Sequence, residues 1–126
     1  MEFKLNDEQL EGYNSACKLF AESYGHNKTI EDLGEFIGKI EGIMKGMPGD
    51  SDSDINKHYI HLGIMYNTLK LEHAERTIEE NRKILDEKKF PSEIVQSAII
   101  TITLPEAEKQ RITSKEMLRY FKDLSV

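Results

Sequence analysis

Tryptophan is absent from this chain of 126 residues, which also holds only one cysteine, three prolines and eight glycines. The single cysteine, Cys17, excludes an internal disulfide, so the chain is not a disulfide-stabilised domain. No run of eighteen apolar residues occurs, which argues against a membrane-spanning helix. The length and composition predict one globular domain that covers residues 1–126.

Basic residues are outnumbered, with 17 Lys and Arg against 23 Asp and Glu and a formal net charge of −6. Because duplex binding depends on Lys and Arg that neutralise phosphates, direct nucleic-acid binding is not expected. The residues Met1–Lys4 carry no signal-peptide pattern, and we therefore expect a cytoplasmic protein without a membrane partner. The sequence holds no glycine-rich phosphate loop, and no cofactor is predicted.

Apolar residues at helical spacing run through most of the chain. An Asn6 cap predicts a first helix over residues 7–24, and a Thr29 cap predicts a second one that ends at Pro48. From Ile55 to Lys89 there is no helix breaker, and the pattern shows two apolar seams in the first half but only one in the second. These features predict a long central helix or, with a turn near residues 68–72, a helical hairpin.

The segment Ile94–Leu104 satisfies two patterns at once. Helical spacing fits its apolar residues, but alternation with threonines is typical of a strand, whose only partner would be Phe3–Leu5. A capping box at Thr113 predicts a last helix, with Met117, Leu118, Phe121 and Leu124 facing inward. We predict an all-α, irregular bundle of five to six helices around the long central helix, with a minor two-stranded ribbon as the alternative for 94–104.

The second predicted helix has a glycine at every fourth position. This glycine row consists of Gly34, Gly38, Gly42 and Gly46. Four interior glycines cost a helix about 2–4 kcal/mol relative to alanine, and they lie opposite the apolar face. Such a smooth face lets another backbone approach closely and predicts an interface with a partner helix or a second copy. The alternatives are a close crossing inside the chain or a weak surface helix.

The length of the central helix gives a second, independent hint. A helix over 55–89 is about 52 Å long, whereas a compact domain of this size is about 36 Å across. The helix would therefore extend beyond its domain and expose an apolar seam for a partner helix to cover. That seam consists of Leu71, Ala74, Ile78 and Leu85.

Two histidines and one aspartate form the only constellation with metal-binding chemistry. Asp54, His58 and His61 lie at i, i+4 and i+7, so a helix presents them on one face and offers two imidazoles and a carboxylate to zinc or iron. The spacing is not the His-Glu-x-x-His of metalloproteases, and paired helical histidines are commonly plain surface residues. A metal-dependent enzyme or sensor is therefore an alternative to the main functional prediction.

The main prediction is a small acidic interaction protein that is not an enzyme. It would bind a macromolecular partner, as adaptors, immunity proteins and phage-type inhibitors do, and would assemble as a homo-oligomer such as a dimer. The short chain, rich in Lys, Ile and Glu, is typical of a bacterium or phage. Acidic clusters at 31–35 and 50–54 would suit a basic protein partner. A second alternative is a small-ligand binder whose pocket forms between subunits.

Overall fold

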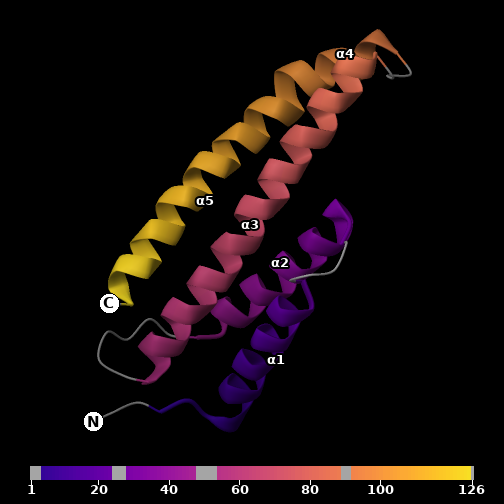
Figure 1. The fold of residues 1–126 in the computed structure, drawn as a ribbon. Coiled ribbons are helices and arrows are strands. Elements are labelled where there is room, and N and C mark those ends of the chain that lie inside the picture. The colour runs from indigo at the N-terminus through magenta and orange to yellow at the C-terminus, as the bar shows by residue number, and fades with distance from the viewer. Residues whose placement is uncertain (1–3, 24–27, 48–53, 89–91, 126) are drawn as a thin grey trace.

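The computed structural model describes residues 4–23, 28–47, 54–88 and 92–125 of the chain. These residues form the helices α1 (Asp7–Ser23), α2 (Ile30–Lys45), α3 (Asp54–Glu87), α4 (Glu93–Ala98) and α5 (Leu104–Leu124), with a π-helical turn, η1 (Ile99–Thr103), between the last two (Figure 1). No strand occurs among the described residues, so the all-α prediction is confirmed and the alternative of a ribbon over 94–104 is wrong.

Both predicted helix starts in the first third of the chain are confirmed. The Asn6 side-chain oxygen accepts a hydrogen bond from the Gln9 backbone N–H at 2.8 Å, and the Gln9 side chain accepts one from the Asn6 N–H at 3.0 Å. Thr29 and Asp32 form the same reciprocal box at the start of α2. Each box satisfies N–H groups that have no partner inside the helix. The predicted stop at Pro48 lies outside the described residues.

The central helix α3 is continuous over 34 residues and about 51 Å long, so the alternative of a hairpin with a turn near residues 68–72 is wrong. Its interior polar side chains bond to their own helix. Asn67 Nδ2 donates to the Gly63 carbonyl oxygen at 2.7 Å, and Asn81 Nδ2 donates to the Thr77 carbonyl at 2.7 Å. These bonds satisfy the amides locally, so neither residue interrupts the helix.

The helices α4 and α5 continue one another through η1. Ala98 and Leu104, which flank η1, have helical φ and ψ values, so the chain does not break at either. The Leu104 N–H bonds to the Ile99 carbonyl, five residues back, immediately before Pro105. A wider turn at this place lets a helix pass a proline that has no N–H to donate. The helix α5 also runs through Thr113 without a break, so the predicted start of a last helix at Thr113 is wrong. Within the described residues, four helical rods replace the five to six predicted helices.

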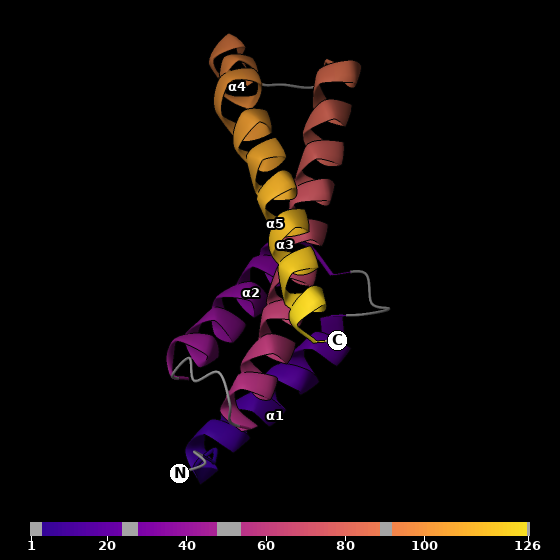
Figure 2. The same cartoon turned by 90° about the vertical axis from the view of Figure 1, so that its left-hand side faces the viewer.

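The main core lies where α1 and α2 pack on the first half of α3. Its buried residues are Ala16, Leu33, Ile40, Met47, Leu62, Met65 and Leu69. The rod α4–η1–α5 runs antiparallel to α3 on the other side, as Figures 1 and 2 show. Beyond the reach of α1 and α2, the second half of α3 and the adjacent part of the α4–η1–α5 rod extend together. We call this part of the molecule the two-helix arm (Figure 1).

The last turns of α5 pack closely against α3 at Gly63. A Cβ atom at this position would lie 2.6–2.7 Å from three ring carbons of Phe121, which is a steric clash. The Phe121 ring is buried and also makes an edge contact with Tyr59, with ring centroids 6.1 Å apart. Gly63 therefore sets the distance between the two longest rods.

Candidate functional site

The apolar seam predicted on α3 is packed against the chain's own α5. Ala74 is 1% exposed and Ile78 is 6% exposed, while Leu71 and Leu85 are half-buried. The prediction of a long helix that extends beyond the core is confirmed, but the expected exposure of its seam is wrong because α5 returns along it. Any partner that binds this arm meets its outer surfaces rather than the seam.

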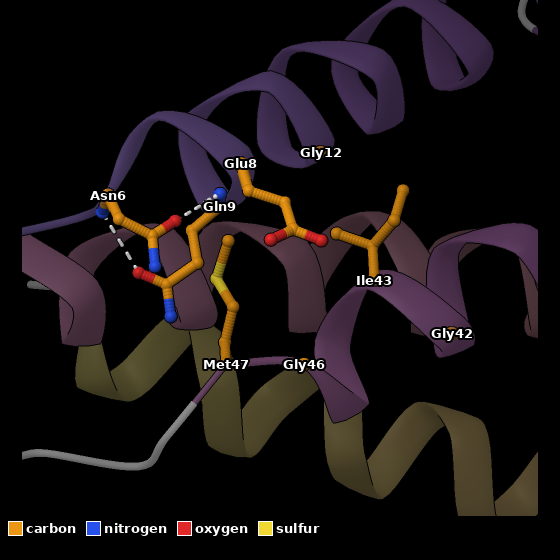
Figure 3. Close-up of a pocket in the computed structure, with 8 residues that line it drawn as sticks. All are labelled: Asn6, Glu8, Gln9, Gly12, Gly42, Ile43, Gly46 and Met47. Carbon is orange, nitrogen blue, oxygen red and sulfur yellow. Dashed lines mark hydrogen bonds between the residues drawn. The ribbon is translucent and has the colours of Figure 1, made fainter.

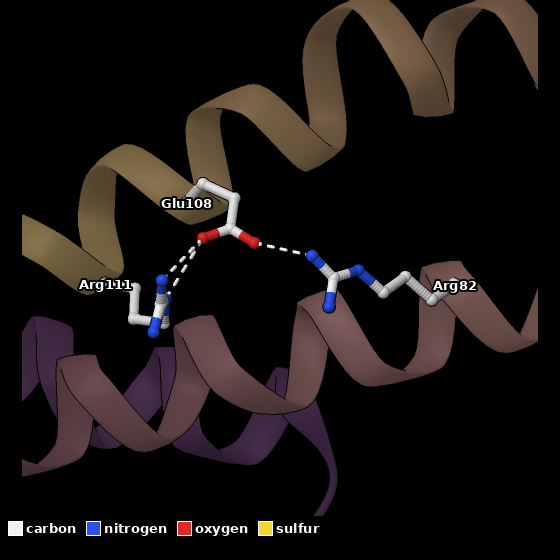
Figure 4. Close-up of polar contacts among 3 residues, drawn as sticks. All are labelled: Arg82, Glu108 and Arg111. Carbon is white, nitrogen blue, oxygen red and sulfur yellow. Dashed lines mark hydrogen bonds and ion pairs between the residues drawn. The ribbon is translucent and has the colours of Figure 1, made fainter.

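Polar contacts hold the two rods of the arm in register (Figure 4). Glu108 on α5 bridges two arginines: Arg82 Nη2 on α3 lies 2.9 Å from one carboxylate oxygen, and Arg111 Nη2 lies 3.0 Å from the other. Further along, Gln110 Nε2 donates to the Lys70 carbonyl oxygen at 3.3 Å. These groups are partly exposed, so they favour one alignment of the rods more than they stabilise the fold.

The glycine row lies on the exposed face of α2. A Cβ atom at Gly38 or Gly42 would have no atom within 4 Å outside the helix backbone, and one at Gly34 would lie 3.9 Å from His73 Nε2. Within the described residues, no other helix of the chain makes the close approach that these glycines permit at Gly38 and Gly42. The smooth face is open, as an intermolecular contact would require.

One end of the glycine row borders a hollow of about 350 Å³ between α1 and α2 (Figure 3). Its lining residues are Asn6, Glu8, Gln9, Gly12, Gly42, Ile43, Gly46 and Met47. The two amides of the lining are already bonded to each other's backbone in the capping box of α1, and the Glu8 carboxylate reaches over Ile43 (Figure 3). This set combines one carboxylate with apolar walls and contains no nucleophile paired with a base.

The histidines of the predicted metal site are engaged with Tyr13 of α1. The Tyr13 hydroxyl lies 2.5 Å from His61 Nδ1, and the His58 ring stands edge-on to the Tyr13 ring with centroids 4.4 Å apart. No group of three His, Cys, Asp or Glu side chains within the described part of the chain is arranged to hold a metal ion. The side chain of Asp54 lies outside the described residues, so the metal site stays a prediction.

Burial raises the pKa of Tyr13 to about 12, and the side chain of Cys17 adds to the shift through a hydrogen bond and its charge. The phenol is therefore protonated at neutral pH, and its hydroxyl shares a hydrogen bond with His61 Nδ1. Cys17 is a free, half-buried thiol next to this pair. The arrangement explains the tyrosine and histidine as an inter-helix contact between α1 and α3.

The most exposed of the large apolar side chains lie on α4, η1 and α5, where the sequence predicted no interface. Ile94 is 81% exposed, Ile102 56% and Tyr120 55%. Met117 and Leu124, which the sequence assigned to the interior, are also exposed, so that prediction is wrong for them, whereas Phe121 is buried as predicted. The helical spacing of these residues was visible in the sequence, but only the packing of α5 on α3 shows which face it leaves open.

The exposed residues Ile94, Ile102, Met117, Tyr120 and Leu124 belong to one line along the rod, whose members are spaced by three or four positions. We call it the exposed stripe; it consists of Ile94, Ala98, Ile102, Glu106, Lys109, Thr113, Met117, Tyr120 and Leu124. All nine are exposed except Ala98, which is half-buried. At about 100° per residue, the stripe within α5 lies about a quarter turn from the buried Ala107, Ser114 and Phe121.

The first part of the exposed stripe is slightly concave. A shallow hollow of about 400 Å³ is lined there by Glu93, Ile94, Ser97, Ala98, Thr101 and Ile102. From Ile94 to Pro105 the sequence contains no charged residue. An uncharged helical surface with exposed isoleucines is a feature of protein contact surfaces more than of solvated ones.

The described helices contain no segment that is long and apolar enough to cross a membrane. Comparisons of the chain with protein-family models, with curated proteins and with solved structures give no match.

Proposed function

We propose that this chain is a non-catalytic binding protein that holds a macromolecular partner against the exposed stripe. The observation that carries the proposal is the exposure of Ile94, Ile102 and Tyr120 along one line of a single rod. Each buried CH₂ group contributes about 0.8 kcal/mol, so covering these side chains supplies a driving force for association. A protein of this kind acts through its affinity and needs no reactive group.

The chemistry of the surface favours a protein partner over nucleic acid. The net charge of −6 opposes binding to phosphates, and the exposed acidic residues Glu31 and Glu35 at the start of α2 would attract basic side chains. Adaptors, immunity proteins and phage-type inhibitors are classes that work in this way, and we include homo-oligomeric assembly in the proposal.

The glycine row is a second contact surface in this proposal. Its open face at Gly38 and Gly42 accepts another backbone at short range. The row lies on α2 and the exposed stripe lies on the α4–α5 rod, on the other side of α3 (Figure 1). The two surfaces can therefore be tested separately.

The test compares one pair of exposed isoleucine substitutions on the stripe with a single isoleucine substitution elsewhere on the same rod. Proteins captured by the wild-type chain are identified and purified, and their binding is then measured by calorimetry. We expect Ile94→Ser with Ile102→Ser to weaken binding at least about tenfold, because these are the two most exposed apolar side chains of the stripe. Ile100→Ser is the matched control, since Ile100 is 51% exposed and lies about 200° round the helix from Ile102.

Equal binding by the wild type and by the double variant would contradict the proposal, as would a wild type that binds no macromolecule, its own copy included. Circular dichroism establishes that the variants keep their helices, so that a loss of binding is not a loss of folding.

A further inference from the structure

The charges on the exposed stripe have a defined order. Apolar residues occupy both ends of the stripe, and the only two charged residues are Glu106 and Lys109, adjacent to each other near its middle. Both are exposed. A surface that is apolar at its ends and carries one acid and one base beside its centre is complementary to itself when it is turned end over end.

We propose that a second copy of this chain covers the exposed stripe, with the two rods antiparallel and the two-fold axis between Glu106 and Lys109. In this register each Glu106 faces the partner's Lys109, so two ion pairs form across the axis. A parallel pairing would instead place Glu106 against the partner's Glu106 and Lys109 against the partner's Lys109, which is repulsive. The inference rests on the proposed function, because it names the occupant of the same surface.

In the same register, the apolar end of each stripe faces the opposite end of the partner's stripe. With the axis between positions 106 and 109, Ile94 reaches the partner's Tyr120, Ala98 reaches the partner's Met117, and Ile102 reaches the partner's Thr113. The contact runs over the length of the rod, about 45 Å from Ile94 to Leu124. Ile102 of η1, which is β-branched and a poor helix former alone, would be covered by it.

The position of the stripe on the rod supports a helix pair. It lies about a quarter turn from the face that packs on α3, so α5 would contact α3 on one side and the second copy on the next. Two arms joined in this way form an antiparallel four-helix arrangement, in which each rod has two neighbours. The Glu108 bridge to Arg82 and Arg111 stays intact, because Glu108 is not part of the stripe.

The experiment uses sedimentation velocity on the full chain over a range of concentrations. We expect the wild type to reach twice the mass of the 14.5 kDa chain. Lys109→Glu and Glu106→Lys should each weaken the dimer at least about tenfold, because each creates like-charge contacts on both sides of the axis. The double variant with both substitutions should restore it, since the ion pairs re-form with the signs exchanged. Lys115→Glu, on the same helix but off the stripe, is the matched control.

Cysteine cross-linking checks the direction of the pairing in a Cys17→Ala background. In the antiparallel register two copies of Lys109→Cys lie close to the axis and cross-link on oxidation. Two copies of Ile94→Cys lie about 40 Å apart and do not cross-link, whereas a parallel pairing would join both.

A monomeric wild type at all concentrations, or single charge reversals without effect, would overturn the dimer. If Ile94→Ser with Ile102→Ser still abolishes the binding of a different protein in that case, the proposed function stands and only the occupant changes. If the serine variants affect neither dimer nor partner, both proposals fail.

Discussion

Along the first half of α3, the helices α1 and α2 cover one side and the end of α5 covers another, and the contacts on the α2 side reach as far as Arg76, which donates to the Lys28 carbonyl oxygen. Beyond Arg76, the α4–η1–α5 rod is the only described element beside α3 (Figures 1 and 2). The residues Leu62 and Leu69 in the first half have no exposed surface, while Ile78 in the second half retains 6%. A helix surrounded on two sides forms a core, but two helices side by side leave their flanks open. The same helix therefore serves as the centre of the fold at one end and as one side of a two-helix arm at the other.

The largest expected effect compares one core residue from each half. Leu69→Ala should lower the free energy of unfolding by about 3–5 kcal/mol, because the enclosed site cannot collapse around the cavity. Ile78→Ala should cost less, about 2–3 kcal/mol, since the two-helix arm can close or admit water. Urea denaturation of both variants measures the difference. Equal losses would show that the arm is as tightly packed as the three-helix core.

A change at Gly63 tests the contact between the first half of α3 and the end of α5. Gly63→Ala should destabilise the protein by about 1–3 kcal/mol, because the new Cβ clashes with the Phe121 ring and pushes the end of α5 outwards. Adding Phe121→Leu, which shortens the side chain, should recover part of this loss although Phe121→Leu alone is destabilising. A loss from Gly63→Ala without such recovery would place its cause elsewhere in the helix.

A smaller effect of opposite sign is expected on the exposed face of α2. Gly38→Ala and Gly42→Ala should each stabilise the protein by up to about 1 kcal/mol, because alanine favours a helix and neither Cβ meets another atom. Thermal unfolding measures the gain, and the assays of assembly and binding are repeated on the same variants. A gain in stability with unchanged assembly and binding would remove the glycine row from the proposed contact surfaces.

The bridge in the arm should contribute still less. Glu108→Gln keeps the shape of the side chain but removes the charge that Arg82 and Arg111 share, and we expect a loss of about 0.5–1 kcal/mol. In the Glu108→Gln variant, amide hydrogen exchange should become faster in α4 and η1 than in the wild type, whereas exchange in α1 should not change. Glu41→Gln is the control, because its pair with Lys45 lies on the surface of α2 and should be worth less.

The smallest effect depends on pH and concerns the three-helix half. Burial between the helices lowers the pKa of His73 below its usual 6.5, so the folded chain binds this proton less readily than the unfolded chain. The contribution of neutral His73 to the free energy of unfolding is therefore fully present above pH 6.5 and is lost as the pH falls below that value. The difference in unfolding free energy between wild type and His73→Gln should shrink between pH 8 and pH 5. A constant difference would contradict the role of His73.

Local patterns predicted the parts of the fold that depend on neighbouring residues. The capping boxes at Asn6 and Thr29 and the unbroken run of α3 follow from interactions within one or two turns. The segment 94–104 was ambiguous because isoleucine and threonine fit both patterns. The rod continues through it by a π turn before Pro105, which no propensity predicts.

The candidate surfaces divide in the same way. Spacing alone located the glycine row on one face of a helix, and the structure leaves that face open. The seam from Leu71 to Leu85 was correctly recognised as apolar, but its cover comes from a helix some thirty residues further along the chain. The exposed stripe was missed because the inward and outward apolar residues of α5, such as Phe121 and Tyr120, are adjacent in sequence.

The helical class and the starts of the first two helices follow from the sequence alone, since hydrogen bonds and side-chain contacts of short range decide both. The sequence left open whether residues 55–89 form one long helix or a hairpin. The tertiary structure decided that α5 packs along α3, and hence that the seam on α3 is buried while the line from Ile94 to Leu124 is exposed. Burial depends on which distant segment returns to cover a given face. A helix with two apolar faces carries no local signal that says which of them its own chain will cover.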